Sequence, residues 1–167
     1  MLLTIIVNNN ESLRQMTLPE QIAAVRRTIH RLMTRRLSGR TRRPFQQLLA
    51  LKAIATEGVR TQAALAERLL VDAPAVSRLV DRLEEEGLVK RGAGEDRRCV
   101  RLEVTEASQP DLEVLSQEIE GMEAEFGRHL SAEEMRDLRR LLEKLQAGLT
   151  QNHEGVNPEA PGGAGQA

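Results

Sequence analysis

Aromatic residues are almost absent from this chain of 167 residues, which holds two Phe and neither Tyr nor Trp. Proteins that bind single-stranded nucleic acid stack its bases on aromatic side chains, so this composition argues against that class. Cysteine occurs once, which excludes a disulfide framework and agrees with a reducing environment. No apolar run approaches the roughly 20 residues that a membrane-spanning helix needs. The sequence therefore predicts a cytoplasmic protein with no membrane partner.

Signatures of catalysis and of metal binding are lacking as well. The three histidines, His30, His129 and His153, show none of the spacings typical of metal ligands. No Ser or Cys stands in a motif that would pair it with a base, and no Gly-rich phosphate-binding loop is present. We therefore expect no enzyme activity, no catalytic residue, no metal and no cofactor.

Net charge is also nearly absent, at −1, but it is unevenly distributed. Residues 1–60 hold 11 basic and 3 acidic side chains, residues 61–104 hold 8 and 9, and residues 105–167 hold 5 and 13. This asymmetry suggests a part that binds a polyanion beside an acidic part. Arg outnumbers Lys by 21 to 3. Its planar guanidinium binds phosphate well, although a GC-rich codon bias explains the ratio equally well.

Hydrophobic periodicity predicts helices over most of the chain. One helix runs from Pro19 to about Leu37, and a second runs from Phe45 to a stop at Gly58. Acidic helices follow residue 106, with leucine-rich stripes at spacings of three and four residues. Such stripes are usually core, but the domain is too small to cover them. A helical dimer interface explains them better.

The stretch from Thr61 to Gly87 predicts two short helices joined by a tight turn. Thr61 is placed to cap the first helix and Asp72 the second, and Pro74 is tolerated in a first helical turn. The second helix is expected to run from Ala73 to Glu86. Two helices joined by a turn of about three or four residues are typical of a helix-turn-helix.

The second helix of this pair has one apolar face. At about 100° per residue, the residues that share the apolar arc are Val76, Leu79, Val80 and Leu83, and those that point away are Pro74, Ser77, Arg78, Asp81 and Arg82. Small residues near its start would let the helix enter a major groove, where Arg78 can bind guanine or phosphate. The alternative is an ordinary amphipathic helix with a solvated face.

A β-hairpin is predicted directly behind this helix pair. Leu88 to Arg91 is expected to form one strand, Gly92 to Arg98 a turn, and the alternating apolar residues from Val100 to Val104 a second strand. A hairpin in this position is a wing.

The tip of the hairpin carries the charged residues Asp96, Arg97 and Arg98. Exposed arginines on a narrow hairpin can enter a minor groove, where Asp96 would hold one of them in place. The alternative is a solvated turn. The neighbouring Cys99 is either an incidental small residue or, if its thiolate is favoured there, a sensor of oxidants.

The combination resembles the MarR (multiple-antibiotic-resistance regulator) family of winged-helix transcription factors. The resemblance extends from about Ile22 to Leu149 and is strongest from Thr61 to Ser108. Within that stretch its specific motifs are "RLVDRLEEEGLVKR", the wing residues "EDRR", and "VT" at Val104 and Thr105. It implies a mainly α-helical fold with a small β-hairpin wing, that is, a winged helix-turn-helix with N- and C-terminal dimerisation helices. It also implies a homodimer on a pseudo-palindromic operator in double-stranded DNA.

The residues and the resemblance together give a set of expected DNA contacts: Thr61, Gln62, Pro74, Ala75, Ser77, Arg78, Arg82, Asp96, Arg97 and Arg98. Many members of the family bind small anionic or aromatic effectors between the dimerisation helices and the DNA-binding lobe. Residues that could line such a pocket here are Arg27, His30, Arg31 and Phe45. The alternative is that these arginines face solvent or DNA and that His30 is structural.

The expected organisation is a flexible N-terminal extension at 1–18, one domain at 19–151 and a disordered tail at 152–167. Within the domain, a DNA-binding lobe covers about 44–105, and dimerisation helices cover 19–38 and 106–150. We therefore predict a sequence-specific DNA-binding regulator, a repressor released by a small-molecule effector. The alternative is a helical dimeric adaptor that binds protein and whose winged domain no longer binds DNA.

Overall fold

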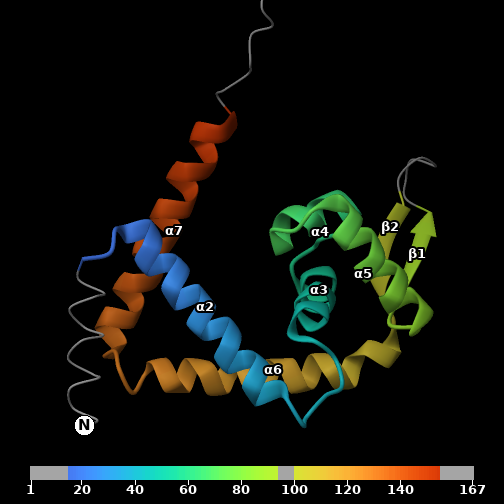
Figure 1. Cartoon of the computed structure of the whole chain (residues 1–167), viewed down its shortest axis with the longest axis horizontal. Coiled ribbons are helices and arrows are strands. Elements are labelled where there is room, and N and C mark those ends of the chain that lie inside the picture. The colour runs from blue at the N-terminus through green and yellow to red at the C-terminus, as the bar shows by residue number, and fades with distance from the viewer. Residues whose placement is uncertain (1–14, 94–99, 155–167) are drawn as a thin grey trace, which may run out of the picture. The chain divides into compact units, whose positions relative to one another are not determined.

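The computed structural model describes residues 15–93 and 100–154, and the elements in these ranges are mostly helical (Figure 1). In chain order they are α2 (Leu18–Leu37), α3 (Phe45–Thr56), α4 (Gln62–Leu69), α5 (Ala73–Glu85), β1 (Val89–Ala93), β2 (Val100–Val104), the 3-10 helix η1 (Glu106–Ser108), α6 (Gln109–Phe126) and α7 (Ala132–Glu154). Two compact units divide between Met122 and Glu123. The mainly helical fold with one hairpin confirms the predicted fold class.

Helices α2 and α3 begin and end at local signals in the sequence. The backbone N–H of Thr17 donates to the Glu20 carboxylate at 2.7 Å, which closes the first turn of α2. Gly39, with φ of +88°, turns the chain after α2. Pro44 precedes the first residue of α3, where its missing N–H costs nothing.

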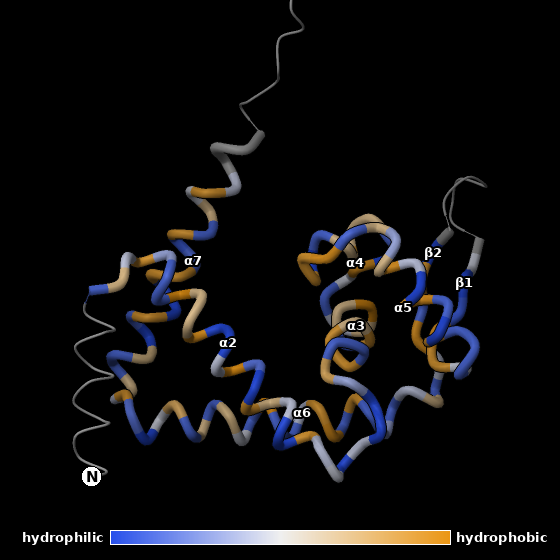
Figure 2. Tube along the Cα trace, in the orientation of Figure 1, coloured by the Kyte–Doolittle hydropathy of each residue, from blue (hydrophilic) through white to orange (hydrophobic). Residues whose placement is uncertain are grey.

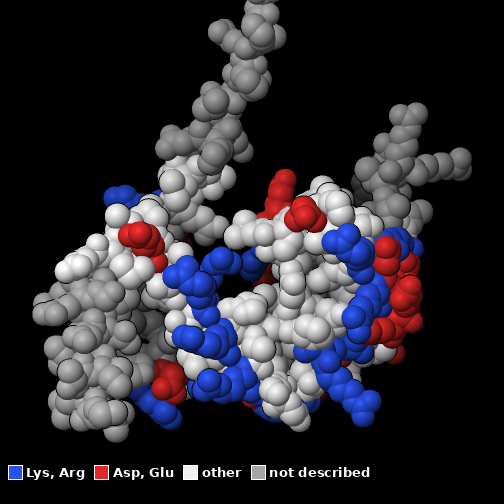
Figure 3. Space-filling view, viewed as in Figure 1, with Lys and Arg blue, Asp and Glu red and all other residues white. Residues whose placement is uncertain are grey.

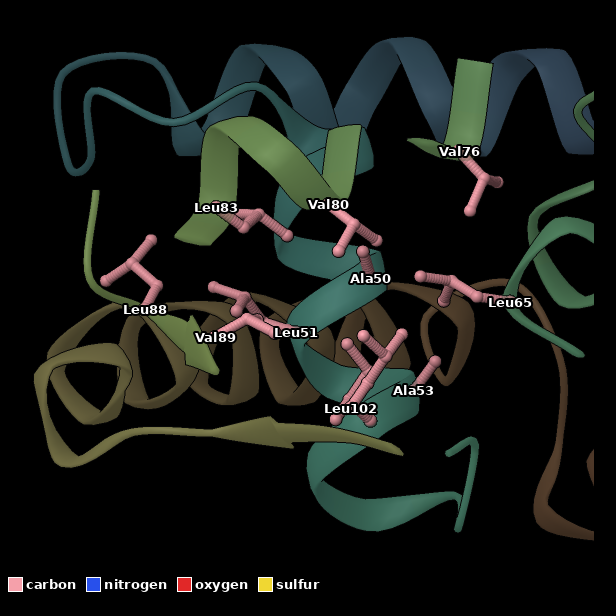
Figure 4. Close-up of a cluster of buried hydrophobic side chains, with 11 residues drawn as sticks. Ala50, Leu51, Ala53, Leu65, Val76, Val80, Leu83, Leu88, Val89 and Leu102 are labelled. Atoms are coloured by element: carbon pink, nitrogen blue, oxygen red, sulfur yellow. The ribbon is translucent and has the colours of Figure 1, made fainter. Parts of the chain in front are cut away.

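The core of the first unit forms around α3, which is apolar on most of its surface (Figure 2). Residues that are almost fully buried come from α3, α4, α5, the start of the hairpin and β2: Ala50, Leu51, Ala53, Ile54, Leu65, Val76, Val80, Leu83, Leu88, Val89 and Leu102 (Figure 4). Burying one such aliphatic side chain stabilises a fold by roughly 1.5–3 kcal/mol. The shared core therefore fixes α5 and the hairpin on one scaffold.

The hairpin is longer than the sequence predicts. Strands β1 and β2 pair antiparallel, with Val89 opposite Val104 and Ala93 opposite Val100. Gly92 and Ala93, expected in the turn, belong to β1, because cross-strand pairing continues through them. The expected wing-tip residues and Cys99 fall within residues 94–99, outside the described residues.

Helix α7 forms most of the second unit. Ser131 and Glu134 exchange hydrogen bonds at its start, with Ser131 N–H donating to the Glu134 carboxylate at 2.8 Å. Apolar residues recur along the helix (Figure 2). Its leucines are 37% to 58% exposed: Leu138, Leu141, Leu142, Leu145 and Leu149. The helix continues to Glu154, so residues 152–154, predicted as the start of a disordered tail, are helical.

Candidate nucleic-acid interface

Helices α4 and α5 each begin at the cap that the sequence predicts. The Ala64 N–H donates to Thr61 Oγ1 at 3.2 Å, and the Ala75 N–H donates to Asp72 Oδ1 at 2.7 Å. Leu70 ends α4 in the left-handed conformation, with φ of 54°. That conformation is unfavourable for a residue with a Cβ. The left-handed Leu70 and the Asp72 cap therefore make the sharp turn that sets the direction of α5.

Helix α5 buries one face and exposes the other. Val76, Val80 and Leu83 are fully buried, and the half-buried Leu79 packs against the same core. The remaining residues of interest are Pro74, Arg78, Asp81 and Arg82, which are exposed, and Ala75 and Ser77, which are half-buried. The helix thus presents to solvent the face that the sequence assigned to DNA.

Arg91 on β1 fastens the hairpin to α5. Its guanidinium donates to Asp81 Oδ1 at 2.5 Å and to the Glu84 carboxylate, and its backbone N–H donates to Glu84 Oε1 at 3.3 Å. The hydrogen bond to Asp81, supported by that to Glu84, raises the pKa of Arg91 above its ordinary value. One side chain therefore pairs with two acidic groups of α5 and fixes the base of the hairpin against the helix.

A second arginine cluster surrounds Glu86, directly after α5. Arg82 Nε donates to Glu86 Oε1 at 3.1 Å, and Arg43, from the loop between α2 and α3, donates to the other carboxylate oxygen. Arg43 also donates to Asp111 of α6, which accepts from Thr41 Oγ1 at 2.7 Å. Burial raises the pKa of Glu86, but the bonds from Arg82 and Arg43 outweigh it and hold that pKa below its ordinary value.

The count of 8 basic and 9 acidic side chains over residues 61–104 does not show which of these charges remain unpaired. Arginines neutralise Asp81, Glu84 and Glu86, three of the acidic groups that offset the arginines in that count. Arg78 is exposed and has no ion-pair partner within the described part of the chain. Figure 3 shows basic and acidic side chains intermixed over α5 and the hairpin. The exposed face of α5 therefore keeps a free cation despite the near-zero sum.

The structure brings together two of the four expected effector-pocket residues. The rings of His30 and Phe45 meet edge to face, with centroids 5.2 Å apart. Arg27 and Arg31 are exposed on α2, over which basic side chains gather in Figure 3. Thr61 and Gln62 stand at the start of α4, the former exposed and the latter half-buried.

Arg43 and Arg91 were absent from the expected site residues. Arg91 had a usable signal, because it lies on the same face of its strand as the buried Val89, and a charged residue there needs partners. Arg43 carried no such signal in the sequence, because its partners lie 43 and 68 residues further along the chain. Both arginines position α5 and do not belong to its exposed face.

Metal binding and membrane insertion find no support in the described residues. No group of three or more His, Cys, Asp or Glu side chains in residues 15–93 and 100–154 is arranged to hold a metal ion. No helix in these ranges is long and apolar enough to cross a membrane.

Comparison with known proteins gives consistent matches. The sequence model of the MarR family matches residues 38–98. The chain is similar to the apo form of MarR from E. coli, at 28% identity over 78% of this chain and 97% of that one, with a TM-score of 0.66. It is also similar to the transcriptional regulator BldR from Sulfolobus solfataricus, at 27% identity over 85% and 96% of the two chains, with a TM-score of 0.65.

A third similar structure contains DNA. A mutant form of E. coli MarR, crystallised in complex with operator DNA, matches at 28% identity over 77% of this chain and 92% of that one, with a TM-score of 0.65. The match therefore includes a protein whose structure was determined on its operator.

Proposed function

The chain belongs to the MarR family of winged-helix transcriptional regulators, and on this premise we propose that it binds a pseudo-palindromic DNA operator as a homodimer. Two copies of α5 enter successive major grooves, whose centres lie about one helical turn apart. The protein acts as a repressor and leaves the operator when a small anionic or aromatic effector binds.

The exposed face of α5 is the observation that carries this proposal. Ala75 and Ser77 are small, so the start of the helix can approach the floor of a major groove. Arg78 extends from the same half of the helix and can donate two hydrogen bonds to guanine O6 and N7. Arg82, one turn further on, is partly engaged by Glu86 and is placed for a phosphate.

Contacts with the DNA backbone would come from both sides of α5. Thr61 and Gln62 at the start of α4, together with exposed Pro74, are placed to meet phosphates beside the groove. Arg97 and Arg98 of the wing would enter the minor groove, with Asp96 orienting them. These contacts set register, while Arg78 and Ser77 read sequence.

Exposed apolar stripes on α2 and α7 support the dimer. On α2 the exposed apolar residues are Leu18, Ile22 and Val25, at spacings of four and three residues. On α7 the leucine stripe is longer and equally exposed. Soluble monomers rarely leave such stripes open to water, and a second copy of the chain would cover them.

The effector would bind beside α2 and the start of α3. The edge-to-face pair of His30 and Phe45 offers a surface for an aromatic ring. Arg27 and Arg31, one helical turn apart, offer cations for an acidic substituent. An effector held there would be most effective if it changed the separation of the two α5 helices.

Selection of duplexes from a random pool tests the proposal and returns the half-site spacing. The logarithm of the binding constant for the selected duplex should fall linearly with the logarithm of salt concentration, with a slope of about −0.9 per phosphate contacted. A duplex of equal length with scrambled half-sites is the control. Weak binding to all duplexes with a flat salt dependence would favour the adaptor function.

Replacing Arg91 with methionine should weaken operator binding by up to about ten-fold, or about 1.4 kcal/mol. The variant loses the bonds to Asp81 and Glu84, so the hairpin is no longer fastened to α5 and two carboxylates near the DNA become unpaired. Fluorescence anisotropy with the selected operator measures the change, and circular dichroism checks the fold.

Lys90→Met is the matched control for the role of Arg91. Lys90 pairs with Glu103 across the hairpin at 3.0 Å, and both side chains are largely exposed. An exposed ion pair of this kind contributes little to the stability of the fold. Equal operator affinity in the two variants would refute the fastening role.

A further inference from the structure

A large concavity lies beside the loop that joins α2 to α3. Its volume is about 820 Å³, and it is bounded by this loop, the start of α3, the end of α5 and Asp111 at the start of α6. None of the expected effector residues is among those that line it. The concavity is therefore a different place from the one at His30 and Phe45.

Guanidinium groups dominate the lining of this concavity. Arg42, Arg43 and Arg82 line it together with Arg40, whereas its acidic lining residues are Glu86 and Asp111. Arg40 is held by Glu118 and Gln117 of α6. The lining thus contains more cations than anions, and a dissolved anion would be attracted to it.

Arg42 differs from the other arginines that line the concavity, because they are engaged by carboxylates and it is not, within the part of the chain that the structure describes. It is exposed, and no carboxylate within the described ranges pairs with it. Its neighbour Arg43 is only 21% exposed at its side chain and is bonded to both Asp111 and Glu86. An anion at this loop would therefore find one free guanidinium and a second one already shared between carboxylates.

Glu86 occupies the position that such an anion would take. Its carboxylate accepts hydrogen bonds from Arg43 and from Arg82, which belong to different elements. It is 32% exposed at its side chain, so a ligand can reach these arginines from solvent and compete for them. A ligand with two acidic groups could bind Arg42 with one and replace Glu86 with the other.

We propose that this concavity binds a small polyanion, carrying phosphate or carboxylate groups, through Arg42, Arg43 and Arg82, and that Glu86 competes with the ligand for two of these arginines. Planar guanidinium groups bind both kinds of acid through paired hydrogen bonds. The displaced Glu86 follows the last residue of α5 directly. Binding would therefore loosen the attachment of α5 to the α2–α3 loop.

The regulatory part of this inference rests on the proposed function. Arg43 connects Glu86 beyond α5 with Asp111 of α6, so it joins the DNA-reading helix to a helix that leads out of the lobe. Breaking the link to Glu86 frees the end of α5 and lowers operator affinity. The binding part does not depend on DNA and is testable with the free protein.

Calorimetric titration of the full chain with pyrophosphate and, separately, with citrate tests the binding part, with sodium chloride adjusted to constant ionic strength. Arg42→Gln should weaken binding by about ten-fold or more, the effect of losing a charge-assisted hydrogen bond. Glu86→Gln should strengthen binding, because it removes the competing carboxylate. Arg26→Gln, an exposed arginine of α2 outside the concavity, should bind as the unmodified protein does.

Opposite effects of Arg42→Gln and Glu86→Gln would establish the site. Whichever of pyrophosphate and citrate binds more tightly then assigns phosphate or carboxylate chemistry. No binding of either anion at millimolar concentration, or equal binding by Arg42→Gln and the unmodified protein, would overturn the proposal. If Glu86→Gln does not fold, the comparison of Arg42→Gln with Arg26→Gln decides alone, because Arg42 makes no ion pair in the described part of the chain.

A second measurement separates the site from the proposed function. The binding anion should reduce operator affinity in the unmodified protein and have less effect on Arg42→Gln. Arg42-dependent anion binding without that reduction would refute the regulatory link and leave the site. A chain that binds the anion but no duplex would refute the proposed function instead.

Discussion

Alanine in place of Arg78 is expected to lower affinity for the selected operator by about 1–3 kcal/mol, roughly five-fold to 150-fold. Arg78 is exposed on the half of α5 nearest its N-terminus, and no carboxylate within the described residues engages it. In the proposed complex its guanidinium would therefore bind DNA without giving up an ion pair within the protein. The loss should be largest for this residue because a base contact carries both affinity and sequence preference.

Gel-shift titration with the selected operator measures this loss, and Arg128→Ala is the charge-matched control. Arg128 is 74% exposed in the turn after α6 and pairs with Glu125, so its removal changes net charge equally. Arg78→Lys adds a second distinction, because lysine keeps the charge but loses the planar fork. Operator binding by Arg78→Ala at the level of the unmodified protein would show that α5 does not read bases through this residue.

The starts of α4 and α5 were predictable from the sequence because their determinants are local. A cap is decided by a hydrogen bond between residues three apart, as at Thr61 with Ala64 and at Asp72 with Ala75. The buried face of α5 follows in the same way from helical geometry, which places Val76, Val80 and Leu83 on one side. The start of α5 and the identity of its buried face are thus determined by residues within the segment itself.

The attachment of α5 to the rest of the lobe could not be predicted in the same way. Arg43 reaches Glu86 and Asp111 only because folding brings three elements together, and no periodicity records that. The observed ends of helices and strands also differ from the predicted ones where no strong local signal marks them. Gly92 was expected to begin the turn but pairs within β1, and α7 runs through residues expected in a tail.

The near-zero sum of charges over residues 61–104 does not show which of these charges are paired within the protein. The sum over residues 61–104 treats every charge as free, yet Arg91 alone engages Asp81 and Glu84. Arg43, counted with the basic residues 1–60, engages Glu86 within that range. The charge that DNA would meet is therefore set by which arginines remain unpaired, and a count along the chain cannot supply that.

Glutamate in place of Leu142 should convert the proposed dimer to a monomer and reduce operator affinity by about 10²- to 10⁴-fold, because the two half-sites would no longer be bound by one linked pair. Leu142 is 46% exposed in the middle of the α7 stripe. In the dimer each such leucine would be covered; because these side chains are already about half buried, covering one contributes about half of the roughly 1.5–3 kcal/mol of full burial. A carboxylate at the same position would have to be buried without a partner, which is strongly unfavourable.

Ala147→Glu provides the matched control, because it adds the same charge to the same helix on the opposite side. At about 100° per residue, position 147 lies roughly 140° from Leu142 and away from the whole leucine stripe. Ala147→Glu should remain dimeric by light scattering at micromolar concentration and keep its operator affinity, while Leu142→Glu loses both. A dimeric Leu142→Glu variant would mean that the α7 stripe is not the interface. A monomeric variant that still bound the operator with the original affinity would mean instead that one copy of α5 suffices, since without a second copy there is nothing to link the half-sites.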